Sequence, residues 1–471
     1  MALAEAGALE IVILAAGKGT RMKSVLPKVL HKLCGQTLVE RTLRAVAALK
    51  PERIVLVVGY EAEKVVVEAR RVASLGVFEE SKLMAVVQEQ QLGTGHAAQV
   101  GLGAISDTAR KLLFVPGDDP LLSSAVLKEL VDGHSASAKL SFLSCVVDEP
   151  GSFGRVIRDS KGKVARIVEA RDCTKEELAV SETNTSIYLG DVGFISEALA
   201  SLKNDNAQGE FYLTDIVGYA VEKSADVNAV VTENQDAVTG ANSRFELSML
   251  EQKRREEINK ALMDAGVTIE DPSTVYVDEG VEVGKDCFLG AGTRLRGRTK
   301  LAEGVYVEGD TLIDNSSVGA RSRIRLFSYI EDANIAEDCM IGPMARIRPG
   351  SELAAEVKIG NFVETKKASF GKGAKASHLS YIGDAEVGVE TNIGAGTITC
   401  NYDGARKHKT TLGDRVFIGS NTALVAPVTV SDGAYVGAGS VITKDIPKDS
   451  LGVARARQNN IDGWASKRAK K

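Results

Sequence analysis

A glycine-rich segment near the N-terminus brings three cationic side chains close together: Lys18, Arg21 and Lys28. The segment reads LAAGKGTRM from Leu14, and it directly follows an apolar run. Glycines let backbone N–H groups approach a ligand closely, and the turn from a strand into a helix points those groups at anions. We therefore expect a diphosphate or triphosphate here, and a purely structural turn is the alternative.

The glycine spacing does not match the dinucleotide or P-loop motifs, because Met22 occupies the position of the third glycine of G-x-G-x-x-G. A second candidate is Asp118, in a PGDDPL segment that follows the apolar run 112–115. An aspartate at the carboxyl end of a strand lies where ligands bind in α/β sheets. Carboxylates and substrate phosphates are the usual ligands of Mg²⁺. Asp118 is thus a predicted metal ligand, with a turn-forming aspartate as the alternative.

The elements that position these residues follow from the hydrophobic pattern of the first half. Short apolar runs, as at 10–15, 54–59, 112–116 and 140–147, alternate with amphipathic segments. This alternation predicts an α/β domain with a largely parallel sheet. In the charged stretch that follows, Leu247, Leu250, Ile258 and Leu262 are spaced for one helix face. We expect an α/β domain over 1–242 and a connecting helix over 243–266.

The second half, 267–471, has a different period, because aliphatic residues recur every six positions in three registers. They are Val283, Leu289, Leu295, Leu301, Val307 and Ile313, then Ile335, Ile341, Ile347, Leu353 and Ile359, then Leu412, Ile418, Leu424, Val430, Val436 and Ile442. A hexapeptide repeat is typical of a parallel β-helix, whose coils stack one aliphatic side chain per strand into a continuous core. The polar segment 400–410 interrupts the repeat, so we expect a loop that carries function or is a passive excursion.

Composition and charge exclude several classes of protein. A chain of 471 residues with 44% hydrophobic and 26% charged residues is a globular protein of two or more domains. The net charge of -5 gives no electrostatic basis for binding nucleic acid. No apolar run approaches the roughly 20 residues that span a bilayer. The six cysteines form no C-x-x-C pair. We expect a cytoplasmic protein with no membrane insertion, no secretory signal and no zinc site.

These motifs together carry a resemblance to a known family. The segment from Leu14 with Pro27-Lys28 resembles the signature of sugar-1-phosphate nucleotidyltransferases. Further motifs follow in the order of that family: QEQQLGTGH at 88–96, Gly117-Asp118, Phe153-Gly154-Arg155, Glu169, Asn184 and Asn242. With the hexapeptide half included, the chain resembles the bacterial bifunctional N-acetylglucosamine-1-phosphate uridylyltransferases and glucosamine-1-phosphate acetyltransferases. Only a short N-terminal extension and the basic tail 467–471 lie outside the resemblance.

For the first half, the resemblance implies that UTP and N-acetylglucosamine 1-phosphate react to give UDP-N-acetylglucosamine. It assigns Leu14, Ala15, Ala16, Gly17, Lys18, Lys28, Gln88, Gly93, Thr94, Gly154, Glu169, Asn184 and Asn242 to UTP or the nucleotide sugar. It makes Arg21 and Lys28 catalytic at the phosphates, and it gives Mg²⁺ the ligands Asp118 and Asn242. Two departures concern the sugar contacts, because Ser186 stands where a glycine is expected and Pro116 where an aromatic residue is commoner.

For the second half, the resemblance implies transfer of an acetyl group from acetyl-CoA to glucosamine 1-phosphate. The amine must lose a proton to attack, and His378 is the expected base. The resemblance assigns Arg348, Lys366, Tyr381, Asn392 and Lys407 to the sugar phosphate, and Ala395, Asn401, Tyr402, Ser420, Ala438 and Arg455 to acetyl-CoA. It also implies a left-handed β-helix and a homotrimer with shared acetyl sites.

Two alternative hypotheses do not account for these residues. A nucleotidyltransferase with one activity and a short regulatory β-helix would lack His378 together with the Asn401-Tyr402 loop. A β-helix that only holds subunits together has no need of Arg348, Lys366 and Lys407 near one histidine. Both hypotheses are therefore weaker than the two-activity enzyme.

Overall fold

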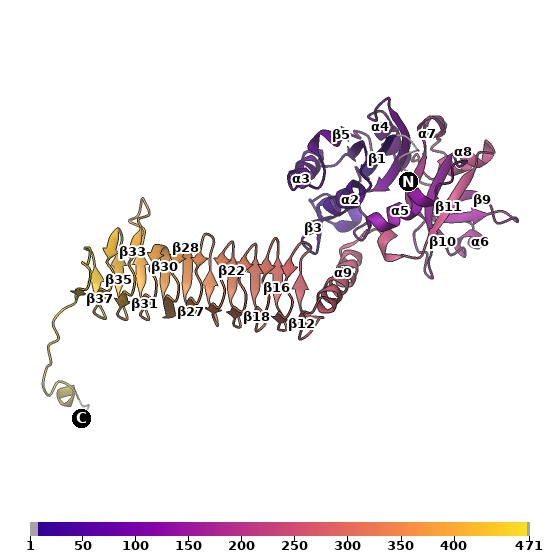
Figure 1. Cartoon of the computed structure of the whole chain (residues 1–471). Coiled ribbons are helices and arrows are strands. Elements are labelled where there is room, and N and C mark those ends of the chain that lie inside the picture. The colour runs from indigo at the N-terminus through magenta and orange to yellow at the C-terminus, as the bar shows by residue number, and fades with distance from the viewer. Residues whose placement is uncertain (1–7, 469–471) are drawn as a thin grey trace. The chain divides into compact units, whose positions relative to one another are not determined.

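The computed structural model describes residues 8–468, so the ends of the predicted domains at 1–7 and 469–471 lie outside the described residues. The chain forms two compact units, Met1–Arg254 and Arg255–Lys471. The boundary between them falls inside helix α9 (Arg244–Asp264), which follows the sheet of the first unit and precedes the coils of the second (Figure 1). Leu247 and Leu250 of this helix are buried, and Ile258 and Leu262 pack against the core of the second unit.

The first unit is built on one mixed sheet with the strand order β11-β7-β10-β6-β1-β4-β5, to which the β8–β9 hairpin is attached through β10. Its strands are β1 (Ala8–Ala15), β4 (Arg53–Val58), β5 (Leu83–Val87), β6 (Ala109–Pro116), β7 (Leu140–Val146), β8 (Arg155–Arg158), β9 (Val164–Val168), β10 (Glu182–Asp191) and β11 (Val227–Thr232). The four strands from β6 to β5 are parallel, whereas β10 runs antiparallel to both of its neighbours β6 and β7. The prediction of a largely parallel α/β sheet is thus confirmed, with β10 and the antiparallel β8–β9 hairpin as the exceptions.

Helices cover both faces of this sheet, which explains why its central strands are apolar throughout. The helices are α2 (Leu38–Ala47), α3 (Ala62–Ser74), α4 (Thr94–Leu102), α5 (Ser124–Gly133), α6 (Lys175–Leu178), α7 (Val192–Ala200) and α8 (Asp215–Glu222). The short elements are 3₁₀ turns η1 (Thr20–Met22), η2 (Lys28–Leu30), η3 (Glu80–Lys82) and η4 (Asp236–Val238) and the hairpin β2 (Lys32–Leu33) and β3 (Gln36–Thr37). In β1, Ile11, Val12 and Ile13 are all fully buried, because one face packs on α2, α3 and α5 and the other on α4, α7 and α8.

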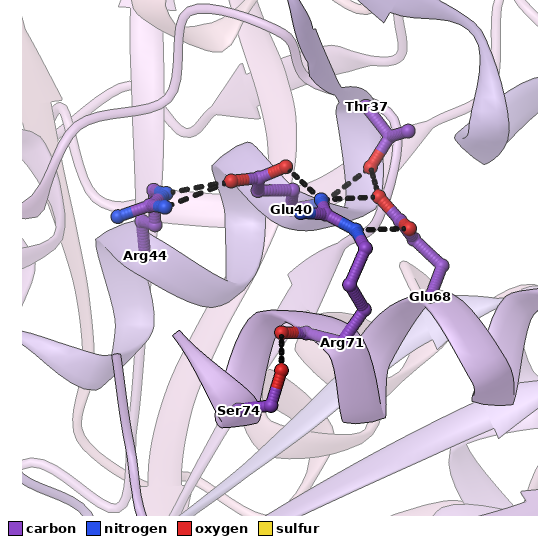
Figure 2. Close-up of polar contacts among 6 residues, drawn as sticks. All are labelled: Thr37, Glu40, Arg44, Glu68, Arg71 and Ser74. Atoms are coloured by element: carbon purple, nitrogen blue, oxygen red, sulfur yellow. Dashed lines mark hydrogen bonds and ion pairs between the residues drawn. The ribbon is translucent and has the colours of Figure 1, made fainter. Parts of the chain in front are cut away.

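A charged network fixes α2 to α3 (Figure 2). Glu40 of α2 is almost fully buried, and it accepts hydrogen bonds from Arg44 and from Arg71 of α3. Arg71 also donates to Glu68 at 2.7 Å, and Glu68 accepts the hydroxyl of Thr37 at 2.7 Å. Thr37 caps α2 by accepting the backbone N–H of Glu40. A buried carboxylate is tolerated here because two guanidinium groups pair with it.

The second unit is a parallel β-helix with three short strands in each coil (Figure 1). One sheet contains β12 (Thr268–Ile269), β15 (Phe288–Leu289), β18 (Tyr306–Val307), β21 (Arg323–Ile324), β24 (Met340–Ile341), β27 (Lys358–Asn361), β29 (Lys375–His378), β31 (Asn392–Ile393), β34 (Phe417–Ile418), β37 (Tyr435–Val436) and β39 (Leu451–Gly452). The other two sides form a single sheet of β13 (Tyr276–Val277), β14 (Glu282–Val283), β16 (Arg294–Arg296), β17 (Lys300–Leu301), β19 (Leu312–Asp314), β20 (Ser317–Val318), β22 (Tyr329–Glu331), β23 (Asn334–Ile335), β25 (Arg346–Ile347), β26 (Glu352–Leu353), β28 (Glu364–Phe370), β30 (Tyr381–Val387), β32 (Ile398–Cys400), β33 (Thr410–Leu412), β35 (Ala423–Val425), β36 (Val428–Val430) and β38 (Val441–Ile442). A 3₁₀ turn η5 (Ser466–Arg468) follows the last coil.

The aliphatic residues that recur every six positions form the core of this β-helix. Leu289, Ile341 and Ile418 represent the three registers, and each is buried in the continuous apolar column inside the coils. Val318, Ile324 and Ile330 continue the column where the register slips, because the step from Ile313 to Val318 omits one residue at a corner. The segment 400–410 leaves the coil between β32 and β33, as the sequence predicted.

Candidate active sites

The glycine-rich segment leaves β1 and leads into η1, beside the carboxyl end of the parallel strands. Gly19 has a φ of +63°, and a Cβ there would overlap the side chain of Lys28. Glycine is therefore required for the close approach of the loop to Lys28. The ammonium of Lys18 lies 5.2 Å from the centre of the Tyr60 ring, on which it packs as a cation–π pair.

Lys28 joins three segments that are far apart in the sequence. Its Nζ donates to Asp118 Oδ2, just after β6, and to Asn242 Oδ1, just before α9, at 2.8 Å. Gly117 holds the end of β6 against β1 through its backbone N–H, which donates to the Leu14 carbonyl at 2.9 Å. On the other side, the Arg41 guanidinium of α2 donates to the Pro120 carbonyl, so α2 also supports this loop. The structure thus places an oxygen pair, one carboxylate and one amide, around a single cation.

This arrangement fits a divalent metal ion. Carboxylate and amide oxygens are ligands that Mg²⁺ accepts, and the two oxygens already converge on one positive charge. The adjacent Asp119 is buried, and burial together with the charge of Asp118 raises the pKa of its carboxyl well above the ordinary value. Among these two aspartates, only Asp118 lines the cavity described next.

A cavity of about 610 Å³ opens over this loop. Its lining includes these predicted residues: Leu14, Ala15, Ala16, Gly17, Arg21, Lys28, Gln88, Gly93, Thr94, Asp118, Glu169 and Asn242. Three more predicted residues are not among those that line the cavity. Lys18 packs on Tyr60, Gly154 lies beneath Glu169, and the Asn184 N–H donates to the Gly154 carbonyl at 2.9 Å.

The cavity has a cationic end and an acidic end. Arg21 and Lys28 line the first, whereas Glu169 and Glu210 line the second. Burial raises the pKa of the Glu169 carboxyl, although the hydroxyl of Thr214, which donates to it at 3.2 Å, acts in the opposite direction. An anion such as a phosphate is favoured at the first end, and neutral hydroxyl groups are favoured at the second.

Sequence reasoning missed several lining residues, among them Gln91, Glu210, Thr214 and Tyr188. Gln91 belongs to the 88–96 motif, and its side-chain amide donates to the Ala16 carbonyl at 2.9 Å. This hydrogen bond fixes the second motif to the first. The motif itself was the available signal for Gln91, whereas Thr214 and Tyr188 reach the cavity only through the folding of distant strands and helices.

In the second unit, the predicted base and most of the predicted acetyl-CoA residues occupy one corner of successive coils. His378 pairs with Asn361 of the preceding coil, and the same register continues to Ala395. The Asn421 N–H donates to the Ala395 carbonyl, the Gly439 N–H to the Ser420 carbonyl, and the Arg455 guanidinium to the Ala438 carbonyl at 3.0 Å. The column therefore runs Asn361, His378, Ala395, Ser420, Ala438 and Arg455. Strands of one sheet are about 4.8 Å apart, so His378 and Ser420 lie roughly 10 Å apart along the axis.

The ring of His378 is oriented by one hydrogen bond. Its Nδ1 lies 2.6 Å from Asn361 Oδ1, and the side chain is exposed. An amide oxygen only accepts, so the ring proton lies on Nδ1 and the lone pair on Nε2. A neutral imidazole in this tautomer presents Nε2 as a proton acceptor. Asn361 was not predicted from the sequence.

Most of the predicted sugar-phosphate residues gather on the neighbouring side of the coils. The charges of Lys407 and Arg348 lower the pKa of Lys366, with Lys407 the larger cause. Arg348 pairs with Glu364 at 2.5 Å, and Tyr381 Oη lies 3.5 Å from the Asn401 amide. Asn392 is not brought to this cluster within one chain, because it lies on β31 in the other sheet, beside Lys375. A phosphomonoester matches three neighbouring cations.

The segment 400–410 forms a small arm that carries Lys407, one of these three cations. Asn401 is buried and donates to Asp384 at 2.5 Å, whereas Tyr402 is exposed. Within the arm, the backbone and His408 donate to Asp403, and these hydrogen bonds lower the pKa of its carboxyl. Lys407 and His408 line a second cavity of about 380 Å³ with Asp384 and Glu386. Within the described residues, no helix is long and apolar enough to span a membrane.

Comparison with known proteins agrees with both halves. The model of the MobA-like NTP transferase domain matches residues 11–156, and that of the hexapeptide repeat of succinyl-transferase matches residues 409–444. The bifunctional protein GlmU of Trichlorobacter lovleyi is 45% identical, with 97% of this chain and 98% of that protein covered. The GlmU protein of Cellvibrio japonicus is 47% identical over 97% of this chain and 98% of its own. A solved inositol-1-phosphate CTP transferase from T. maritima, 17% identical, has a TM-score of 0.42 and covers 53% of this chain and 97% of its own.

The two units and their sites define a nucleotidyltransferase joined to a left-handed β-helical acyltransferase. The chain belongs to the family of bifunctional GlmU proteins. It is therefore an enzyme of UDP-N-acetylglucosamine synthesis with uridylyltransferase and acetyltransferase activities, which uses Mg²⁺, UTP and acetyl-CoA.

Proposed function

We propose that the cavity of the first unit is the uridylyl-transfer site and that the corner headed by His378 belongs to the acetyl-transfer site. The observation that supports the first assignment most strongly is the convergence of Asp118 and Asn242 oxygens on Lys28 inside a cavity with a cationic end. The contact between His378 and Asn361, at the head of the column, supports the second. The two sites lie in separate units, so each reaction has its own residues.

In uridylyl transfer, a phosphate oxygen of N-acetylglucosamine 1-phosphate attacks the α-phosphorus of UTP, and pyrophosphate leaves. Arg21 and Lys28 bring the two anions together and offset the negative charge that develops on the phosphate oxygens. Asp118 and Asn242 would hold Mg²⁺, which, when bound, shares the charge of the triphosphate. Glycine N–H groups of the loop 16–19 and the Gln88, Gly93 and Thr94 segment hold the nucleotide. Glu169, Asn184 and Gly154 surround the sugar.

In acetyl transfer, the amine of glucosamine 1-phosphate attacks the thioester carbonyl of acetyl-CoA. His378 Nε2 accepts the proton that the amine loses, and the thiolate of coenzyme A leaves. Arg348, Lys366, Lys407, Tyr381 and Asn392 hold the sugar phosphate. Ala395, Asn401, Tyr402, Ser420, Ala438 and Arg455 hold acetyl-CoA, and a donor at Ser420 stabilises the oxyanion.

One pair of variants tests both assignments. Asp118→Ala should abolish pyrophosphate release from UTP and leave thiol release from acetyl-CoA near normal, because it removes a metal ligand of the first site only. His378→Ala should lower the acetylation kcat by about two orders of magnitude or more and leave uridylyl transfer unchanged. Loss of both activities in either folded variant would contradict the separate-site assignment.

We also propose a cytoplasmic homotrimer in which neighbouring subunits complete each acetyl site. The position of Asn392, away from the cations Arg348, Lys366 and Lys407 of its own chain, supports this proposal. Sedimentation equilibrium should give three times the chain mass of 50.0 kDa. A fully active monomer would rule out the shared site.

A further inference from the structure

Strand β10 is irregular where it passes the acidic end of the first cavity. Asn184 lies opposite Ser144 of β7, and Tyr188 lies opposite Phe142, so a step of four residues on β10 faces a step of two on β7. Ser186 lies within this bulge with a φ of +62°. Serine is strained in this left-handed region and glycine is not. Among the described residues that line the cavity, Ser186 is the one non-glycine residue with a positive φ.

The bulge turns Ser186 towards the cavity and orients its neighbour. The Ser186 N–H donates to Asn184 Oδ1 at 3.2 Å, which fixes the carboxamide of Asn184. The Ser186 side chain then lines the cavity wall. This geometry needs only the backbone of residue 186, so the hydroxyl group itself has no role in maintaining the bulge.

Tyr188 carries a second hydroxyl that the fold does not use. The side chain has an exposed fraction of 0%, its ring packs on Phe142 with centroids 6.3 Å apart, and it lines the same cavity. Its hydroxyl oxygen is buried and makes no hydrogen bond of normal geometry within the described part of the chain, although the Asn184 side chain interacts with it. A buried hydroxyl without a partner destabilises a protein, and phenylalanine would fill the same space without that cost.

We propose that the hydroxyl groups of Ser186 and Tyr188 bind hydroxyl groups of the acceptor sugar and set the specificity of the uridylyl-transfer site for a hexosamine 1-phosphate. The inference rests on the proposed function of this cavity. Tyr188 interacts with the charge of Glu169, and Ser186 lines the same cavity two residues away along β10. Carboxylates there disfavour a phosphate and favour neutral hydroxyl groups. A bound sugar hydroxyl supplies the missing partner of Tyr188. A site built to pair with a hydroxyl also rejects analogues that lack it.

Two substitutions separate this role from a structural one. Ser186→Gly and Tyr188→Phe each remove one hydroxyl and also remove a strained or unpaired group. We expect the melting temperature of each variant to stay the same or rise. The KM for N-acetylglucosamine 1-phosphate should rise about three- to tenfold, which is the usual effect of one lost hydrogen bond, while the KM for UTP stays the same.

A matched control is Ser224→Gly, because Ser224 is an exposed serine with a φ of +56° outside the cavity. It should gain stability as Ser186→Gly does, with unchanged kinetics. Deoxy analogues of the sugar phosphate then identify the partner: the unsubstituted enzyme should discriminate against one deoxy position, and one of the two variants should lose that discrimination.

The outcomes are distinct. A raised sugar KM with undiminished stability supports the inference. An unchanged sugar KM in both variants, or a lower melting temperature in both, overturns it while the proposed function stands, provided that the unsubstituted chain forms UDP-N-acetylglucosamine. If the unsubstituted chain forms no nucleotide sugar, the proposed function fails and the inference fails with it.

Discussion

Asn361 is a residue whose importance depends on the number of residues in one coil. It lies 17 residues before His378, and these coils pair residues at that separation. The six-residue period identified the strands, but it predicts a step of 18 residues. A coil of 17 residues has one residue fewer at one of its corners, so Asn361 rather than Gly360 lies beside His378. The six-residue period of the strands does not show which corner is shortened. The family motif therefore indicated the proposed base, whereas no signal in the sequence indicated its hydrogen-bond partner.

Asn361→Ala should lower acetyl transfer without unfolding the coil. Without the amide acceptor, the imidazole of His378 turns and takes either tautomer, so Nε2 is less often a proton acceptor. We expect the acetylation kcat to fall about ten- to a hundredfold with the KM for acetyl-CoA nearly unchanged. Steady-state kinetics of thiol release measure both values, and an unaltered kcat would show that the hydrogen bond has no role.

Asn361→Asp provides the complementary test. The carboxylate keeps an acceptor for the Nδ1 proton, so most of the kcat should return. Its negative charge favours the imidazolium form, and the acid limb of the kcat/KM profile should move to higher pH. A merely structural role for Asn361 would leave the pH profile where it is.

At the scale of elements, the charged network between α2 and α3 gives unit 1 a defined dependence on pH (Figure 2). Hydrogen bonds from Arg71 are the largest cause that lowers the pKa of Glu68 below its ordinary value. A carboxyl group with a lowered pKa stabilises the fold above its ordinary pKa, and this stabilisation is lost as the pH falls through the lowered value.

Arg71→Met should therefore destabilise the first unit at neutral pH, and this destabilisation should be smaller in acid. The free energy of unfolding of the variant and of the unsubstituted chain should converge as the pH falls below 4.5, the ordinary value for glutamate, because Glu68 then becomes neutral in both. Denaturant titrations at a series of pH values measure this. A destabilisation that is constant with pH would contradict it.

The coils also depend on glycines at their close approaches. A Cβ at Gly360 would overlap the carbonyl group of Ser377 in the next coil. These residues directly precede Asn361 and His378. Gly360→Ala should therefore separate the two coils at this corner, at a cost of about 1–3 kcal/mol. Acetyl transfer should fall sharply, and uridylyl transfer, which belongs to the other unit, serves as the internal control.

The elements themselves were largely predictable from the sequence, for physical reasons. Ile11, Val12 and Ile13 form an uninterrupted apolar run because helices cover both faces of the sheet, and Leu289 and Ile341 recur with the period of the coils. The antiparallel direction of β10 and the bulge at Ser186 were not predictable, since strand direction and register come from packing against β6 and β7.

At the scale of the whole molecule, the two units should respond differently to loss of metal. A chelator removes Mg²⁺ from the pair Asp118 and Asn242 and should stop pyrophosphate release. Thiol release should persist, because the acetyl transfer proposed here proceeds through the imidazole of His378 and through cationic side chains, and neither requires a metal ion. Readdition of Mg²⁺ should restore uridylyl transfer alone. Loss of both activities on chelation would contradict the proposed division of the two sites.

The constant rise of the coils makes the β-helix a molecular ruler. Val277 and Leu295 occupy the same position in neighbouring coils, so residues 278–295 are one complete unit of length. Duplicating residues 278–295 adds one coil to the β-helix at a point that precedes Arg348, the first residue of the proposed acetyl site. This variant should keep its acetyl transfer. Inserting the same unit between Ile382 and Gly383 keeps the apolar column in register but moves His378 about 4.8 Å further from Ala395 and Ser420. The fold tolerates a change in the number of coils at either place, whereas a ligand of fixed length does not. The number of coils is thus free before the site and fixed within it.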